Sequence, residues 1–138
     1  MTSAAKGVRG LGARVHLFIQ PAMRDEFIAL FRETLACDVV EREFGLAHPV
    51  LLVRFQDGSS FSVEFTELAP LASNTPIGDA NAFRGAWMEF RTDDVAGNQT
   101  ALRQAGIPEF RHKGSEHSYF VAPGGQVFRL LSTSYDGP

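Results

Sequence analysis

The sequence predicts an α+β fold that consists of two tandem βαβββ modules, and three observations support this prediction. The order strand, helix, strand, strand, strand occurs twice along the 138 residues. Residues 69–83, which are rich in Pro, Ala, Asn and Gly and show no periodicity, separate two halves of similar size. Each half ends in two strands joined by a glycine-containing turn, "QDGSS" in the first half and "APGG" in the second. An unrelated α+β chain would rarely repeat all three features.

The first half begins with a strand over residues 13–20, where side chains alternate between two distinct faces. One face consists of Val15, Leu17 and Ile19, and the other of His16, Phe18 and Gln20. A helix is expected from about residue 24 to 36, because apolar side chains recur there at helical spacing and two acidic residues favour its first turn. Three strands follow, at 37–44, 49–56 and 60–67.

The second half repeats this order, beginning with a strand over residues 85–92. Asp93 or Asp94 is expected to cap the next helix, which Gly106 ends ahead of Pro108. Three further strands are predicted at 108–113, 117–122 and 125–132. We therefore expect a single domain over residues 13–133, with module 1 at about 13–68, a linker at 69–83 and module 2 at about 84–133.

Composition excludes several classes of protein. A net charge of −3 argues against a nucleic-acid or acidic-membrane partner, because both favour clustered Lys and Arg. Residues 1–12 lack an apolar segment and are expected to form a flexible tail, not a signal peptide, and no apolar run is long enough for a membrane span. The single cysteine, Cys37, excludes an intramolecular disulfide, favours a cytoplasmic location and is expected to be inert packing.

The sequence resembles the vicinal oxygen chelate superfamily, which includes glyoxalase, bleomycin-resistance and extradiol-dioxygenase proteins. The resemblance covers roughly residues 13–133 and rests on "RVHLFIQ…FIALFRETLACDVV", "VEFTE", "FRTDDVAGNQTALRQAGI" and "HSYFVAPGGQVFRLLS". It implies a glyoxalase-like fold in which two βαβββ modules curl together into a half-open barrel around a ligand cavity. It also implies a homodimer, with sites built by modules of one or both chains.

In the family's metal enzymes, four cavity-facing positions on the first and last strands of each module hold a divalent metal. The resemblance places these positions on His16, Glu64, Trp87 and Arg129. His16 and Glu64 suit a metal, whereas an indole does not bind one and a guanidinium would repel it. We therefore favour no metal cofactor. If a divalent metal binds, His16 and Glu64 are its expected ligands, with a third group that the sequence does not identify; His112 and His117 lie in a turn-rich stretch whose spacing does not direct them toward the cavity.

Arg129 stands in an otherwise apolar strand, so its surroundings decide its role. Strand alternation predicts that Arg129 faces the cavity, together with the side chains of Phe18, Gln20, Ser62, Trp87 and Glu89. A buried cation requires a partner, and a salt bridge with Glu64 or Glu89 is one possibility. The other is that Arg129 binds an anionic or carbonyl-bearing ligand, with Trp87 and Phe18 stacking on the ligand's ring. The two can coexist.

Three functions remain open at this point. The first is a small-molecule-binding protein of the bleomycin-resistance type that holds an aromatic or polar ligand without a metal. The second is an enzyme of the same superfamily (a lyase, isomerase or dioxygenase) that uses His16 and Glu64 either as metal ligands or as an acid/base pair. Alternatively, His16 is simply an interior histidine bonded to Glu64. The third is a dimerising scaffold whose cavity is filled, which we rank last because polar groups are costly core fillers.

Overall fold

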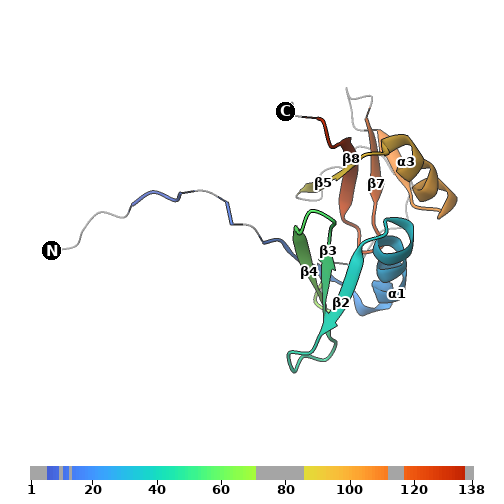
Figure 1. Cartoon of the computed structure of the whole chain (residues 1–138). Coiled ribbons are helices and arrows are strands. Elements are labelled where there is room, and N and C mark those ends of the chain that lie inside the picture. Colours follow the sequence, from blue (N-terminus) through green and yellow to red (C-terminus); the bar gives the residue numbers. More distant parts are fainter. Residues whose placement is uncertain (1–5, 10, 13, 71–85, 112–116, 136–138) are drawn as a thin grey trace.

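The computed structural model describes residues 6–9, 11–12, 14–70, 86–111 and 117–135, so that most of the predicted linker lies outside the described residues. Module 1 comprises β1 (His16–Ile19), α1 (Arg24–Ile28), β2 (Asp38–Arg42), β3 (Val50–Arg54) and β4 (Ser60–Phe65). Module 2 comprises β5 (Trp87–Thr92), α3 (Val95–Gln104), β6 (Glu109–Arg111), β7 (Ser118–Val121) and β8 (Val127–Ser132). The predicted order of elements is confirmed in both halves (Figure 1).

The two sheets have the same topology. Their strand orders are β1-β4-β3-β2 and β5-β8-β7-β6, with the first and last strands of each module parallel and the other neighbours antiparallel. Within the described residues, no strand of one sheet pairs with a strand of the other. The sheets therefore stay open within the chain, whereas the family resemblance led us to expect that they curl together. They meet through side chains instead of strand edges.

A large apolar core joins the two modules, and a smaller cluster of Phe110, Tyr119, Val121 and Val127 lies within module 2. Phe31, on the helical segment of module 1, packs its ring 5.2 Å from that of Phe61 in β4 and 5.8 Å from that of Phe90 in β5. The buried core includes side chains from both sheets and both helices, namely Ile19, Phe27, Leu30, Val39, Leu51, Val53, Val63, Phe65, Leu102, Phe120, Phe128 and Leu130. Figure 1 shows α1 and α3 on the same side of the strands. Each sheet consequently turns one face to this core and its alternate side chains the other way.

The first helix widens along its length. A short 3₁₀ turn, η1 (Pro21–Met23), precedes α1, and α1 continues as a π-helix, η2 (Ala29–Thr34), so the predicted helix is present but is not α-helical throughout. The Leu35 amide donates to the Leu30 carbonyl at 2.9 Å, five residues back, as in a π-helix. Helical spacing in the sequence predicted the buried stripe that includes Phe27, Leu30 and Phe31. Such spacing does not distinguish α from π hydrogen bonding.

The second helix begins at a side-chain cap. Asp94 Oδ1 accepts a hydrogen bond of 2.9 Å from the Gly97 amide, so Asp94 is the cap and Asp93 instead accepts from the Thr133 hydroxyl at 2.5 Å. A side chain at position 97 would collide with the Asp94 carboxylate, which explains the glycine there. Within the described residues, no helix is long and apolar enough to cross a membrane.

An ion pair ties α3 to the strand that follows it. Arg103 Nε donates to Glu109 Oε1 at 2.8 Å and Nη2 donates to Oε2 at 2.9 Å, a two-oxygen geometry that orients both side chains. The hydrogen bond from Arg103 lowers the pKa of Glu109 from its ordinary 4.5 to about 2, although partial burial opposes the change.

We predict that Glu109→Gln lowers the free energy of unfolding by about 0.5–1 kcal/mol near neutral pH, as expected for an exposed pair. The folded-state pKa is depressed, so the contribution is complete above pH 4.5 and is lost as the pH falls toward 2. Urea denaturation of both proteins between pH 7 and pH 2 measures this. The charge-matched control is Glu43→Gln, in the exposed β2–β3 loop. A difference that stays constant across this pH range would contradict the assignment.

Candidate functional site

Three polar side chains and one aromatic ring lie on the side of the first sheet away from the core. They are His16 and Phe18 of β1 and Ser62 and Glu64 of β4, and we call them the His16 face. In this parallel pair, His16 lies opposite Ser62, and Phe18 lies opposite Glu64. His16 Nδ1 lies 2.6 Å from Ser62 Oγ, and His16 Nε2 lies 3.4 Å from Glu64 Oε1. The Phe18 ring meets the imidazole edge-on, with 5.0 Å between centroids. The expected partner of His16 is thereby confirmed as Glu64.

One neutral form of the imidazole satisfies both of its contacts. When Nε2 carries the proton and points toward Glu64, Nδ1 is an acceptor and can accept a hydrogen bond from the Ser62 hydroxyl. A protonated imidazole would instead donate to both oxygens. Because His16 remains about 38% exposed, a bound molecule can reach the group, and His16 with Glu64 has the chemistry of an acid/base pair.

The second sheet carries an aromatic and charged group on the corresponding side, which we call the Arg129 face. Arg129 Nε donates to Glu89 Oε2 at 2.6 Å, and Nη2 lies 2.5 Å from the same oxygen. The guanidinium carbon lies 5.9 Å from the Tyr119 ring centroid and 6.0 Å from that of Tyr135. Trp87 packs against Tyr119 with 5.0 Å between centroids. Of the two carboxylates proposed as partners of Arg129, the structure selects Glu89.

Arg129 stays charged even though it is buried. Among the described residues, Arg129 is the one charged residue that is buried, with 8% of its surface exposed. Burial lowers the pKa of the guanidinium, but the hydrogen bond and negative charge of Glu89, followed by Tyr119 and Tyr135, more than offset this, so the pKa is raised overall. The cation is therefore a permanent feature of this face.

The sheet registers show which positions of the two modules correspond. Glu64 lies two residues beyond Ser62, the partner of His16, and Arg129 lies two residues beyond Val127, the partner of Trp87. Trp87 and Arg129 thus occupy the positions that His16 and Glu64 occupy in module 1.

The residues at these four positions do not fit the family's metal site. His16 and Glu64 could provide two ligands, one fewer than the three protein ligands that catalytic zinc sites keep. The equivalent positions hold an indole and a guanidinium, and neither donates a lone pair to a cation. Within the described ranges, no three His, Cys, Asp or Glu side chains gather closely enough to hold a metal. His117 is exposed just before β7, and His112 lies outside these ranges.

Gln20 is directed toward the backbone. Its amide nitrogen donates to the carbonyl of Glu67 at 2.9 Å and to that of Ala69, so this nitrogen ties β1 to the segment after β4. Sequence reasoning did not single out Tyr119 or Tyr135. Phe120 of β7 lies in the shared core, so alternation along the strand directs the side chain of Tyr119 to the other side of the sheet. This alternation could have identified Tyr119 from the sequence. Tyr135 lies beyond the last strand, where no periodic signal exists.

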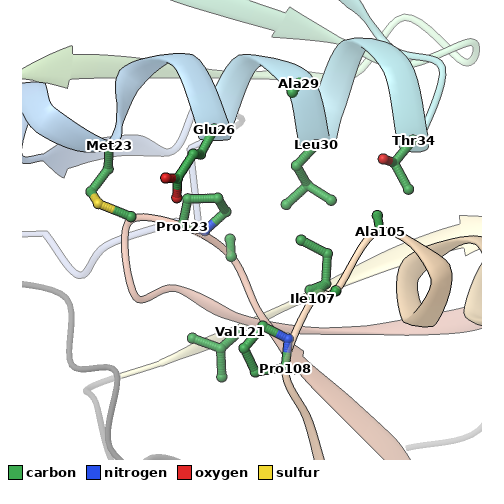
Figure 2. A pocket seen from close by; sticks show the side chains of 12 residues that line it. Met23, Glu26, Ala29, Leu30, Thr34, Ala105, Ile107, Pro108, Val121 and Pro123 are labelled. Atoms are coloured by element: carbon green, nitrogen blue, oxygen red, sulfur yellow. The ribbon is translucent and has the colours of Figure 1, made fainter.

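A groove lies apart from both faces. Figure 2 shows this crevice of about 370 Å³ between the first helix and the chain around β7. Its lining is mostly apolar with one carboxylate, and comprises Met23, Glu26, Ala29, Leu30, Thr34, Ala105, Gly106, Ile107, Pro108, Val121, Ala122 and Pro123. None of the predicted site residues lines it. The groove is large enough for a small ligand but lacks rings and cations, so it does not match the predicted chemistry.

Cys37 is unsuited to nucleophilic chemistry. The residue is partly buried, and this burial raises the pKa of its thiol from 9.0 to about 11, so the reactive thiolate is scarce near neutral pH. The thiol packs against the shared core. This agrees with its expected packing role.

Comparisons with known proteins identify the fold. No protein-family model matches the sequence, and no curated protein is similar to it. Among solved structures, TnmS3, an antibiotic binding protein from Streptomyces sp. CB03234, is 18% identical over 96% of this chain and 100% of its own, with a TM-score of 0.59. The fosfomycin resistance protein FosX from Listeria monocytogenes is 10% identical over 96% and 97%, with a TM-score of 0.62. A glyoxalase/dioxygenase from Nostoc punctiforme is 16% identical over 96% and 97%, with a TM-score of 0.66. The chain therefore has the glyoxalase-like fold that the resemblance of its sequence implied.

The Arg129–Glu89 pair generates a prediction about stability. We expect Glu89→Gln to lower the free energy of unfolding by about 1–2 kcal/mol, because it leaves a buried cation without its counter-charge. The double variant Glu89→Gln with Arg129→Met should recover most of this loss, since neither charge then remains buried. Urea denaturation of the wild type, both single variants and the double variant completes the cycle. Strictly additive losses would show that the two side chains do not interact.

Proposed function

We propose that this chain is a small-molecule-binding protein without the family's four-ligand metal site, and that it holds a planar aromatic ligand with an anionic or carbonyl oxygen on the Arg129 face. The observation that carries this proposal is the buried Arg129 guanidinium, whose carbon lies 5.9 Å from the Tyr119 ring centroid and 6.0 Å from that of Tyr135, with Trp87 packed against Tyr119. A fixed cation next to aromatic rings recognises a ring and an attached oxygen together.

The rings of the Arg129 face support a stacking role. Phe110 stacks on Tyr119, with 5.6 Å between centroids and 27° between planes, and Tyr119 in turn meets Trp87. Trp87 is 39% exposed, whereas Tyr119 and Phe110 are buried, so the indole is the ring that a ligand reaches. Each well-placed aromatic pair contributes about 0.5–1.5 kcal/mol beyond the area it buries. Sequestration of an aromatic molecule fits this surface better than chelation of a metal.

The likeness in fold to an antibiotic-binding protein and a fosfomycin resistance protein is consistent with this proposal. The first name denotes binding of an antibiotic and the second denotes resistance to fosfomycin, in a fold where function varies with the site. A bleomycin-resistance type of function, in which a toxic compound is bound and held, is therefore our first candidate class for this chain.

We also propose that the functional unit is a homodimer. Binding sites for small molecules usually enclose most of the ligand surface, yet each of the two faces leaves an aromatic ring exposed. Phe18 is 51% exposed on the His16 face and Trp87 is 39% exposed on the Arg129 face. If a second copy covers these faces, it encloses the ligand and removes both rings from water. In such a dimer, the His16 face of one copy and the Arg129 face of the other can serve one site.

The binding proposal predicts that Trp87→Ala weakens binding of naphthalene-2-carboxamide, a neutral planar probe, at least tenfold, because the exposed stacking ring is removed. Isothermal titration calorimetry measures the affinity, and native mass spectrometry of the same samples reports the subunit number. Phe44→Ala is the matched control, since Phe44 is an exposed ring in the loop between β2 and β3 and belongs to neither face. It should leave the affinity unchanged.

Two results would overturn this assignment. If Trp87→Ala binds the probe as well as the wild type while Ala29→Trp, which fills the groove of Figure 2, abolishes binding, the ligand site is the groove. If the wild type binds neither this probe nor its carboxylate analogue, the binding proposal fails. A monomer in native mass spectrometry would contradict the homodimer.

The alternative function is that of an enzyme, and the 2.6 Å contact between His16 and Ser62 favours it, because this contact fixes the ring beside Glu64. Such an enzyme would abstract a proton next to a carbonyl with the His16–Glu64 pair, and Arg129 would stabilise the enolate. It predicts that the protein accelerates deuterium exchange into the methyl group of 2-acetonaphthone in D₂O, and that His16→Ala and Glu64→Gln abolish this. NMR measures the exchange. Equal exchange by all three proteins would exclude this mechanism.

A further inference from the structure

We infer that Glu89 is an exchangeable internal counter-ion, and that the Arg129 face is specific for planar aromatic carboxylates, whose carboxylate takes the place of Glu89 on Arg129. This inference rests on the proposed function, because it names the ligand class for the same face. It also assigns to Glu89 the role of setting how strongly an anionic ligand binds.

The two members of the ion pair differ in how firmly they are held. The Arg129 side chain is 10% exposed and is flanked by Tyr119 and Tyr135, whereas the Glu89 side chain is 42% exposed. Withdrawal of Arg129 would break its aromatic contacts as well as the ion pair. Rotation of Glu89 toward water breaks only the ion pair and restores hydration to a group that is already half exposed. Glu89 is therefore the member that can leave.

Glu89 does not form the strongest hydrogen-bond geometry that a carboxylate can make with Arg129. Both contacts to Arg129 end on one oxygen, Glu89 Oε2, at 2.6 Å from Nε and 2.5 Å from Nη2. The strongest arginine–carboxylate geometry uses two parallel bonds to two oxygens. A ligand carboxylate that approaches without the constraint of a strand backbone can adopt that geometry.

The position of Trp87 specifies the rest of the ligand. Trp87 and Glu89 lie two residues apart on β5, on the same side of the sheet, and Trp87 meets Tyr119, which also contacts Arg129. An aromatic ring stacked on Trp87 thus directs a ring substituent toward the place of the Glu89 carboxylate. A carboxylate there keeps the buried cation neutralised, whereas a neutral amide does not, so a neutral ligand leaves Glu89 in place.

The exchange can be tested with a pair of probes that differ only in charge. Naphthalene-2-carboxylate and naphthalene-2-carboxamide are titrated calorimetrically into the full-length wild type and into Glu89→Gln. Because Glu89 no longer competes, the variant should bind the carboxylate at least tenfold more tightly than the wild type, while the affinity for the carboxamide changes less than threefold. Glu43→Gln, which removes one exposed negative charge elsewhere, should bind both probes as the wild type does.

Two further variants test whether the preference for the carboxylate depends on Glu89 and Arg129. Glu89→Asp, whose shorter side chain reaches Arg129 less well, should show the same preference to a smaller degree if Glu89→Gln proves too unstable to titrate. The double variant Glu89→Gln with Arg129→Met should lose the preference for the carboxylate. If the wild type binds the carboxamide but neither Glu89 variant gains affinity for the carboxylate, the exchange is refuted and the proposed binding function stands. If no variant binds either probe, both are refuted.

Discussion

The packing of both sheets onto one shared core determines which side chains this protein presents to its surroundings. Phe31 packs on Phe61 of the first sheet and on Phe90 of the second, so the two modules share one large apolar core. Because side chains alternate along a strand, each residue committed to that interior directs its neighbours away from it. Phe61 and Val63 face inward and leave Ser62 outside, and Phe128 and Leu130 place Arg129 on the opposite side. Burial of the apolar residues therefore determines which side chains form the His16 face and the Arg129 face.

The two modules use equivalent positions for different chemistry. In the first, a histidine and a carboxylate lie next to a serine, a combination suited to moving protons. In the second, the corresponding positions hold a tryptophan and an arginine, a combination suited to stacking and charge recognition. Glu89, at the position of Phe18, compensates the arginine's charge. The same architecture thus carries different side chains at equivalent positions of its two halves.

Much of this arrangement is predictable from the sequence, for a physical reason. Period-two and helical spacing record which side chains share a side of a strand or helix, so the order of elements, the inward stripe of the first helix and the separation of His16 and Arg129 from the core side chains of their strands follow from pattern alone. The cavity that these side chains were expected to face does not follow from that pattern. The sequence pattern does not predict that Glu89, and not Glu64, is the partner of Arg129, because this depends on the pairing of β5 with β8. The π-helical turn, the contribution of Tyr135 and the open sheets also escape prediction, since backbone hydrogen bonding and the relation between sheets leave no periodic trace.

The parallel pairing of first and last strands has a consequence for how the chain acquires its structure. His16 and Ser62 meet across 46 residues of sequence, and Arg129 and Glu89 across 40, so each module closes only when its final strand arrives. Ordering such distant segments costs loop entropy before any contact compensates for it, and this slows folding relative to a chain of hairpins. During synthesis the N-terminal strand of each module emerges long before its neighbour exists. The late joining of these strands means that the side chains of each outer face come together only when the first and last strands of that module have paired.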